Sequence, residues 1–301
     1  MKQSYLLAVF ASLLWSSSFA GVKIGLQYAD PFIFAGLRFT LAGVMVLLFT
    51  GRIKGYGIHM RKNWRVIIPL SFFQTSLFYG LLFHGVNRVS AAVAAIILGS
   101  EPLFTALMAH LFMRNEKLSL RKTASIALAM GGLVLISVRR DFSTEAGLRE
   151  LSGILMLFSA VLLGSLSQII IKRKTRDPLF LNSQQMILGG LFLLMFSQIF
   201  GEGVPERIPL PFVAALLWLC FVSASAFSIW FILLKRPGVK VSEINLFKFI
   251  IPAAGAVLSW ILVPGEYPDP VTVTGTVIIT LSIVMYYARK EQLPPALREI
   301  E

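Results

Sequence analysis

The sequence is poor in the residues from which enzymes and metalloproteins build their sites. It has one cysteine, Cys220, inside an apolar run, which excludes a disulfide framework and a cysteine-based zinc site. The three histidines are scattered without HExxH spacing, and no GxxxxGK[ST] nucleotide-binding loop is present. The four aspartates all fall in predicted loops. We therefore expect no enzymatic activity, no metal site, no cofactor and no ATP bound by this chain.

Charged residues are also scarce, at 14% of the 301 residues, whereas hydrophobic residues make up 56%. Soluble domains carry about 25% charged residues, so this chain has too little polar surface to cover itself in water. The net charge of +13 does not form one basic patch, because Lys and Arg stand in short tracts such as 52–65 and 172–176 between long uncharged runs. That distribution is typical of the cytoplasmic loops of a membrane protein and argues against nucleic acid as a partner.

The long uncharged runs predict ten membrane-spanning helices, because a hydrocarbon core about 30 Å thick needs roughly 20 apolar residues per helix. The connections are short, so we expect an all-α membrane protein that forms one compact bundle without an extramembrane domain. The predicted spans are residues 4–24, 31–50, 66–85, 91–113, 121–138, 151–171, 179–200, 210–234, 244–263 and 271–288.

The distribution of basic residues predicts the orientation of these spans. An inner N-terminus places most of the 28 Lys and Arg residues on the cytoplasmic side, as the positive-inside rule requires. We therefore expect both termini to be cytoplasmic, in a multi-pass protein of the plasma membrane, of the bacterial inner-membrane kind. The first span could instead be a cleaved signal peptide, but its charged leader is only Lys2 and the internal repeat requires this span.

The two halves of the sequence resemble each other. DPFIFAGLRFTLAGVMVLLF (30–49) parallels DPLFLNSQQMILGGLFLLMF (177–196), and SEPLFTALMAHLFMRNE (100–116) parallels IIPAAGAVLSWILVPGE (250–266). Each half holds five spans, an odd number, so the second half must enter the membrane upside down. We predict two inverted five-helix repeats around a central cavity. The predicted divisions are a first repeat at 1–138, an outer, periplasmic linker at 139–150, a second repeat at 151–288 and a cytoplasmic tail at 289–301.

Several of these segments resemble a known family. WSSSFAGVKIG (15–25), the DP…R pattern of 30–38 and the run 101–136 are similar to the drug/metabolite transporter superfamily, in its EamA-type ten-helix branch, and LFKFIIPAAGAVLSWILVPGE (246–266) agrees. The resemblance covers nearly the whole chain. It implies a basket of helices around a central cavity, with the last helix of each half at the periphery. It also implies a carrier that exports small metabolites, amino acids or toxic compounds, commonly in exchange for protons.

Glu101 is the first candidate site residue, because it lies in the middle of an otherwise apolar run beside Pro102. An ionised carboxylate at mid-bilayer is costly, so it must face protein or water and be either paired or protonated. Burial favours the protonated form, which suits a group that binds and releases a proton. The alternative is a static hydrogen-bonded carboxyl that fixes packing. Pro252 lacks an acidic neighbour, so the second half cannot duplicate this proton site.

Arg38 and Lys248 are the two basic residues inside predicted spans. Arg38 could hold Glu101 ionised, contact an anionic substrate or snorkel toward the outer headgroups, and we favour pairing or snorkelling over substrate contact. Lys248 lies about one helical turn from the inner face, where snorkelling is easy, so we favour that role for it.

Further cavity candidates are polar or aromatic residues within the spans. On the first helix we expect Trp15 and Ser16 to face the cavity while Ser17, Gly21 and Gly25 pack against a neighbour. The alternative is that the serines bond back to carbonyls one turn earlier. The remaining candidates, each of which could instead serve packing or interface anchoring, are Tyr79, His84, Gln168, Gln184 and Trp230.

Glu116 and Glu266 complete a structural signature with Pro102 and Pro252, since each glutamate follows its proline by the same interval. Each glutamate also precedes the next predicted helix by a few residues. A carboxylate there can accept amide hydrogen bonds or favour the positive end of a helix dipole. We therefore expect a structural role for both.

Together these features predict a secondary active transporter that exports a small metabolite, amino-acid-like or drug-like compound by alternating access, with proton coupling through Glu101. One alternative is an exchanger of phosphorylated or nucleotide-linked sugars, although such anions would want more basic groups than Arg38 and Lys248. A second alternative is a channel-like or transport-inactive membrane protein. The expected partners are a small-molecule substrate, the lipid bilayer and protons, in a monomer or a homodimer.

Overall fold

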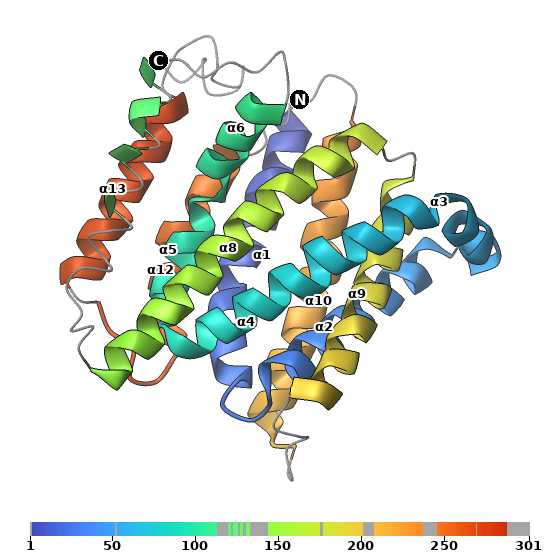
Figure 1. Ribbon diagram of the computed structural model, residues 1–301, viewed down its shortest axis with the longest axis horizontal. Helices are drawn as coiled ribbons and strands as arrows, with labels where there is room; N and C mark the ends of the chain where they lie inside the picture. Colours follow the sequence, from blue (N-terminus) through green and yellow to red (C-terminus); the bar gives the residue numbers. More distant parts are fainter. Residues whose placement is uncertain are drawn as a thin grey trace.

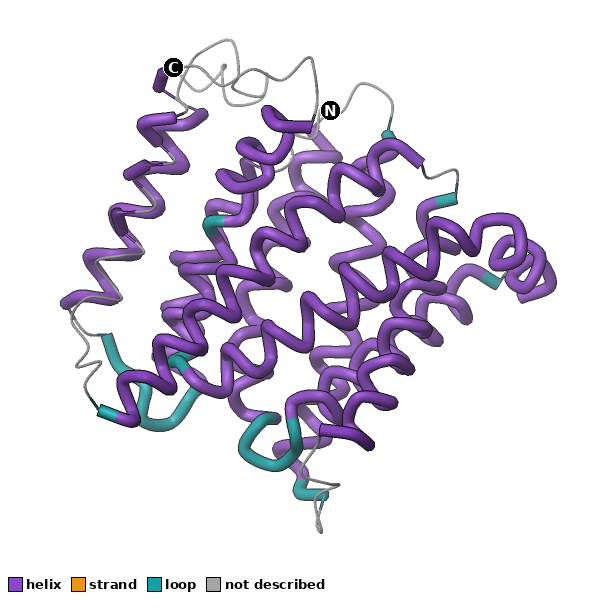
Figure 2. Tube along the Cα trace, viewed as in Figure 1, coloured by secondary structure: helices purple, strands orange, loops and turns teal. Residues whose placement is uncertain are grey.

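The computed structural model contains only helices among the residues that it describes (Figures 1 and 2). These residues are 2–51, 53–112, 120–121, 123–125, 127–128, 131–132, 144–174, 177–200, 208–236, 246–268 and 270–287. The helices are, in chain order, α1 (Lys2–Gly25), α2 (Pro31–Thr50), η1 (Ile53–Gly55), α3 (Tyr56–Leu70), η2 (Ser71–Leu77), α4 (Phe78–Arg88), α5 (Ala91–Gly99), α6 (Glu101–Phe112), α8 (Glu145–Lys174), α9 (Pro178–Phe200), α10 (Leu210–Lys235), η3 (Leu246–Phe249), α12 (Ile250–Leu262) and α13 (Pro270–Tyr287).

Within the described residues, seven helical stretches are long and apolar enough to cross a membrane. Two shorter apolar stretches, Ala253–Leu262 and Val273–Ser282, lie where the ninth and tenth spans were predicted. The predicted fifth span, 121–138, lies largely outside the described residues, so the count of ten helices stays a prediction. The seven stretches are Gln3–Gly25, Pro31–Thr50, Ile53–Arg88, Ala91–Phe112, Glu145–Gln168, Pro178–Phe200 and Leu210–Lys235.

The outer surface of the bundle carries large apolar side chains. Phe49 is 85% exposed, Leu6 70% and Phe200 69%, and each lies on a helix long enough to span a membrane. A water-soluble protein rarely exposes apolar side chains over a large part of its surface. A lipid bilayer is the solvent that suits this surface.

The α2 and α9 helices, which occupy equivalent places in the two halves of the sequence, pack closely against each other. Their crossing depends on glycines, because a Cβ added at Gly190 would lie 2.6 Å from the backbone nitrogen of Thr40. A Cβ added at Gly43 would lie 2.8 Å from the backbone nitrogen of Ile187. Small residues of this kind let membrane helices approach backbone to backbone.

The predicted span 91–113 is divided into α5 and α6, with Ser100 in a turn between them. Pro102 therefore lies in the first turn of α6 and does not kink one continuous helix. The reason is that the first turn of a helix leaves its N–H groups unbonded, so a proline is tolerated there. Glu101 consequently stands at a helix start in the middle of the bundle.

The third predicted span, 66–85, is the central part of a longer helical stretch that runs from Ile53 to Arg88. Its middle section, η2, has π-helical hydrogen bonding directly after Pro69, which lies inside α3. A proline removes one backbone donor, and π-helical turns are found mostly at such irregularities and at functional sites.

Figure 1 shows that α1 and α8, the first helices of the two halves, run in opposite directions through the bundle. The start of α1 and the end of α13 lie at the same end of the bundle, and Glu145 at the start of α8 lies at the other (Figure 1).

Candidate functional site

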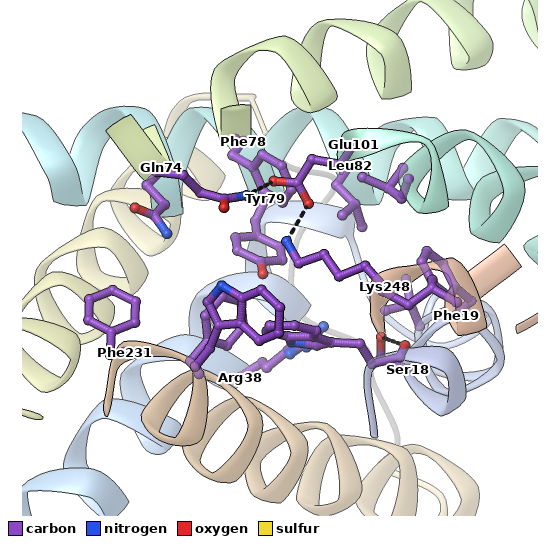
Figure 3. Close-up of a pocket in the computed structure, with 18 of the residues that line it drawn as sticks. Ser18, Phe19, Arg38, Gln74, Phe78, Tyr79, Leu82, Glu101, Phe231 and Lys248 are labelled. Atoms are coloured by element: carbon purple, nitrogen blue, oxygen red, sulfur yellow. Dashed lines mark hydrogen bonds and ion pairs between the residues drawn. The ribbon is translucent and has the colours of Figure 1, made fainter. Parts of the chain in front are cut away.

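A cavity lies between helices of both halves, with walls supplied by α1, α2, α4, α10 and η3 among other elements (Figure 3). The empty space within it, together with the open space at its mouth, is about 880 Å³. Most of its lining is apolar or aromatic, with a few polar groups. Within the described residues, no group of three or more His, Cys, Asp or Glu side chains could hold a metal ion.

An ion pair crosses one side of this cavity (Figure 3). Lys248 Nζ donates to Glu101 Oε2 at 3.0 Å, and Gln168 Nε2 donates to Glu101 Oε1 at 2.6 Å. The side chains of Lys248 and Glu101 are only 6% and 15% exposed. Glu101 begins α6 in the first half and Lys248 lies in η3 in the second half. The ion pair therefore joins the start of α6 in the first half to the 3₁₀-helical turn that leads into α12 in the second half.

The expectation that Lys248 snorkels to the inner headgroups is wrong. Its ammonium group points into the cavity and lies 4.8 Å from the Trp230 ring centre and 5.2 Å from that of Trp15. A buried ammonium group needs compensating charge or an aromatic face, and here it has one carboxylate and two indoles. These three partners together outweigh the short path to the membrane surface.

Arg38 lines the opposite part of the cavity and is buried, at 2% exposure. Its Nε donates to Ser223 Oγ at 2.7 Å, and its guanidinium carbon lies 4.9 Å and 5.6 Å from the ring centres of Phe39 and Tyr79. None of the described residues offers it a carboxylate partner. The two favoured expectations, pairing with Glu101 and snorkelling, are therefore wrong, because Lys248 pairs with Glu101 and Arg38 lies inside the bundle.

Four more sequence-predicted candidates line the cavity beside Glu101, Arg38 and Lys248. These are Trp15, Tyr79, Gln168 and Trp230. The rings of Trp15 and Trp230 meet edge to face at 5.0 Å, a favourable geometry for aromatic pairs.

Ser16 does not line the cavity. Its hydroxyl donates to the Ser12 carbonyl at 2.8 Å, which is the alternative stated for these serines. Ser18 lines the cavity in its place, together with Phe19 and Val22. These three residues follow Trp15 by three, four and seven positions, the spacing of one helical face. That spacing was the signal that could have identified Ser18.

His84 and Gln184 also lie away from the cavity. His84 Nδ1 is 2.9 Å from the Gly80 carbonyl, and its ring centre is 4.4 Å from that of Phe32. Gln184 Nε2 donates to the Tyr56 carbonyl at 2.9 Å, and its Oε1 lies 2.7 Å from His59 Nδ1. Both residues serve contacts between helices.

Gln74 lines the cavity from the π-helical segment η2 and was not among the candidates predicted from the sequence. A π-helical turn inserts an extra residue into the helical period, so side chains after it face a direction that a regular period of 3.6 residues does not predict. Phe227 on α10 is a second lining residue that was missed.

Glu266 accepts amide hydrogen bonds, but from the other half of the chain. Its Oε1 accepts from the Ala91 N–H at 2.7 Å and its Oε2 from the Ala92 N–H at 3.4 Å, and Ser259 also donates to it. It therefore caps the start of α5 and not the helix that follows it in sequence. Glu116 lies outside the described residues, and Pro252 lies in the first turn of α12 as Pro102 does in α6.

The model of the EamA-like transporter family matches residues 2–138 and 151–288. The chain belongs to this family of the drug/metabolite transporter superfamily, and it is a multi-pass integral membrane transporter.

Similar proteins carry names of the same kind. An uncharacterized transporter of Archaeoglobus fulgidus is 25% identical over 293 residues, which cover 97% of this chain and 99% of the relative. The uncharacterized transporter YvbV of Bacillus subtilis is 24% identical over 287 residues, 93% of this chain and 90% of the relative. A solved structure described as "Crystal structure of protein" has a TM-score of 0.66 at 19% identity and covers 95% of this chain and 96% of that one. This structural similarity shows a shared fold and does not show a shared function.

Proposed function

We propose that this transporter is a secondary carrier that exports a small metabolite across the plasma membrane by alternating access, with Glu101 as its proton-binding group. The observation that carries the proposal is the buried ion pair between Glu101 and Lys248 at the cavity. Two further features support a carrier driven by a gradient: helices of both halves line the cavity, and the sequence contains no ATP-binding loop.

The ion pair can act as a two-state contact between the halves. In one state Glu101 is ionised and holds Lys248. When a proton neutralises Glu101, the charge attraction across the 3.0 Å contact is lost and Lys248 keeps only its aromatic neighbours. Because α6 and η3 belong to different halves, weakening this contact favours a conformation in which the halves separate on that side.

The proposed architecture is ten helices in two inverted repeats. Its support is the opposite direction of α1 and α8 (Figure 1), the equivalent places of Pro102 and Pro252, and the close packing of α2 on α9. Inverted repeats place the substrate near the bilayer midplane between the halves, which fits a cavity lined from both.

Exchange of phosphorylated or nucleotide-linked sugars is not favoured by the geometry. Such substrates carry two or more negative charges and would need several free basic groups. Of the two basic side chains that line the cavity in the described structure, Lys248 is already paired with Glu101, which leaves Arg38.

The test begins with a screen for metabolites and toxic analogues that cells tolerate better when they overproduce the protein. A compound found in this way is then loaded into proteoliposomes, and its flux is followed with and without an imposed pH gradient. We expect flux that saturates with concentration and accelerates with the gradient. Glu101→Gln should abolish the dependence on pH, because an amide at this position cannot bind and release a proton.

The matched control is Glu145→Gln, which removes an exposed carboxylate at the start of α8, away from the cavity. This variant should transport as the original protein does. Flux with unchanged pH dependence in Glu101→Gln would remove Glu101 from coupling, and flux that never saturates would indicate a pore.

A further inference from the structure

We propose that the substrate is an organic monoanion, with one carboxylate or similar oxyanion that binds Arg38 and an apolar or aromatic body. This inference rests on the proposed transport function, because it names the substrate class of the same cavity. Four observations carry it. Among the described residues, Arg38 is a buried cation without a carboxylate partner, and two buried indole N–H groups have no acceptor. Both oxygens of Glu101 already accept hydrogen bonds, and most of the cavity lining is apolar.

Arg38 is the uncompensated cation. It is 2% exposed and lines the cavity, and within the described residues its guanidinium group has a single hydrogen bond, from Nε to Ser223. A buried charge without a partner is unfavourable unless a counter-charge arrives. A guanidinium group presents two parallel N–H donors that match the two oxygens of a carboxylate. A ligand oxyanion would therefore complete this site.

The cavity also has spare donors. Trp15 Nε1 and Trp230 Nε1 are buried without a hydrogen-bond acceptor, and both side chains border the cavity. Buried N–H groups in proteins are nearly always bonded, and an unbonded one costs free energy. Gln74 Oε1 is a buried acceptor without a donor in the described part of the chain, and a ligand hydroxyl or amide N–H would satisfy it.

A cationic ligand fits less well. Both oxygens of Glu101 are occupied, by Gln168 and by Lys248. A ligand amine would have to displace the Lys248 ammonium from Glu101 and from the faces of two indoles. Glu101 balances Lys248, so the charges on the lining residues leave the single positive charge of Arg38, which one negative charge neutralises.

The other residues that line the cavity indicate the chemistry of the uncharged part of the substrate. Phe19, Phe78, Phe227, Phe231 and Leu82 are among the lining residues. Surfaces of this kind bind apolar and aromatic groups and offer no hydrogen-bond partners to the hydroxyl groups of a sugar. The shared chemistry of the expected substrates is therefore a small carboxylic acid with a hydrophobic or aromatic chain.

The test is a binding measurement on the purified protein in detergent, by isothermal titration calorimetry, with matched probes. Three acids (benzoate, 3-phenylpropionate and hexanoate) are compared with their amides and with the corresponding primary amines. We expect at least one acid to bind about 10-fold or more tightly than its amide and its amine, since hydrogen bonds between charged groups are stronger than those between neutral groups.

Variants then locate the effect. Arg38→Gln should weaken binding of the preferred acid by about 10- to 100-fold and leave the amide unchanged, and Arg38→Lys should recover part of the loss. Arg61→Gln, which removes an exposed arginine from α3, should change neither the binding of the acid nor that of the amide. The comparison of acid with amide in the original protein does not depend on how any variant folds.

Equal binding of each acid and its amide, preference for the amines, or no binding of any acid would overturn the inference. So would a loss of acid binding in Arg61→Gln equal to that in Arg38→Gln. Saturable flux of a compound without a negative charge would reject the substrate class and leave the carrier function standing. Acid binding without any gradient-driven flux would reject the carrier function and leave the anion site standing.

Discussion

Replacing Glu101 with glutamine and Lys248 with methionine, singly and together, measures how strongly the ion pair holds the two halves of the protein. At an Nζ–Oε2 distance of 3.0 Å, an effective dielectric constant of about 20 gives an attraction of about 5.5 kcal/mol. Removal of one partner leaves a buried charge or an unmet donor, which costs about 3–5 kcal/mol in buried pairs. Removal of both partners leaves no unpaired charge.

Each single variant should therefore lower the free energy of unfolding by about 3 kcal/mol. The loss in the free energy of unfolding of the double variant should be about 2–3 kcal/mol smaller than the sum of the two single losses. That difference is the coupling energy expected of residues in direct contact. The assay is reversible unfolding in mixed micelles titrated with sodium dodecyl sulfate, followed by tryptophan fluorescence. A control cycle of Glu101→Gln with Arg61→Gln should be additive within about 0.5 kcal/mol. Additivity of the Glu101 and Lys248 variants would show that the two side chains do not stabilise each other in the folded protein.

Three further predictions concern packing and caps. Gly190→Ala should lower the free energy of unfolding by about 1–3 kcal/mol, because its Cβ would lie 2.6 Å from a backbone nitrogen of α2. The control is Gly57→Ala, which has open space around it. In the same assay this variant should be neutral or stabilising by up to about 1 kcal/mol. Glu266→Gln should speed amide hydrogen exchange at Ala91, measured by mass spectrometry, since the N–H loses a charged acceptor; unchanged exchange would contradict the cap. Cys220 is buried and should react with a maleimide only after denaturation, so rapid labelling in the membrane would contradict its placement.

The membrane class and most helices could be predicted because the length of an apolar run is a direct physical requirement of the bilayer. Glu101 could be selected for the same reason, since a carboxylate in the middle of such a run needs a partner. Trp15 and Tyr79 followed from their positions on predicted spans. Each of these conclusions follows from the sequence of a single segment and from the membrane that surrounds it.

The partners could not be predicted, because they come from contacts between segments far apart in the sequence. Lys248 was assigned to the inner membrane surface by counting along one helix, but η3 turns it toward Glu101 of the other half. Glu266 caps α5 for the same reason, although its ability to accept amide hydrogen bonds was predicted. Gln74 depends on the π-helical turn, which leaves no periodic pattern in the sequence.

The most direct test of the account asks whether the two halves enter the membrane with opposite polarity. Single cysteines are introduced as Gln3→Cys or Glu145→Cys in a Cys220→Ser background, at exposed positions on opposite ends of the bundle, and intact cells are treated with a membrane-impermeant maleimide. If the two halves have opposite polarity, the cysteine at position 145 reacts from outside, whereas the cysteine at position 3 reacts only after the membrane is opened. Labelling of both positions from the same side would contradict opposite polarity.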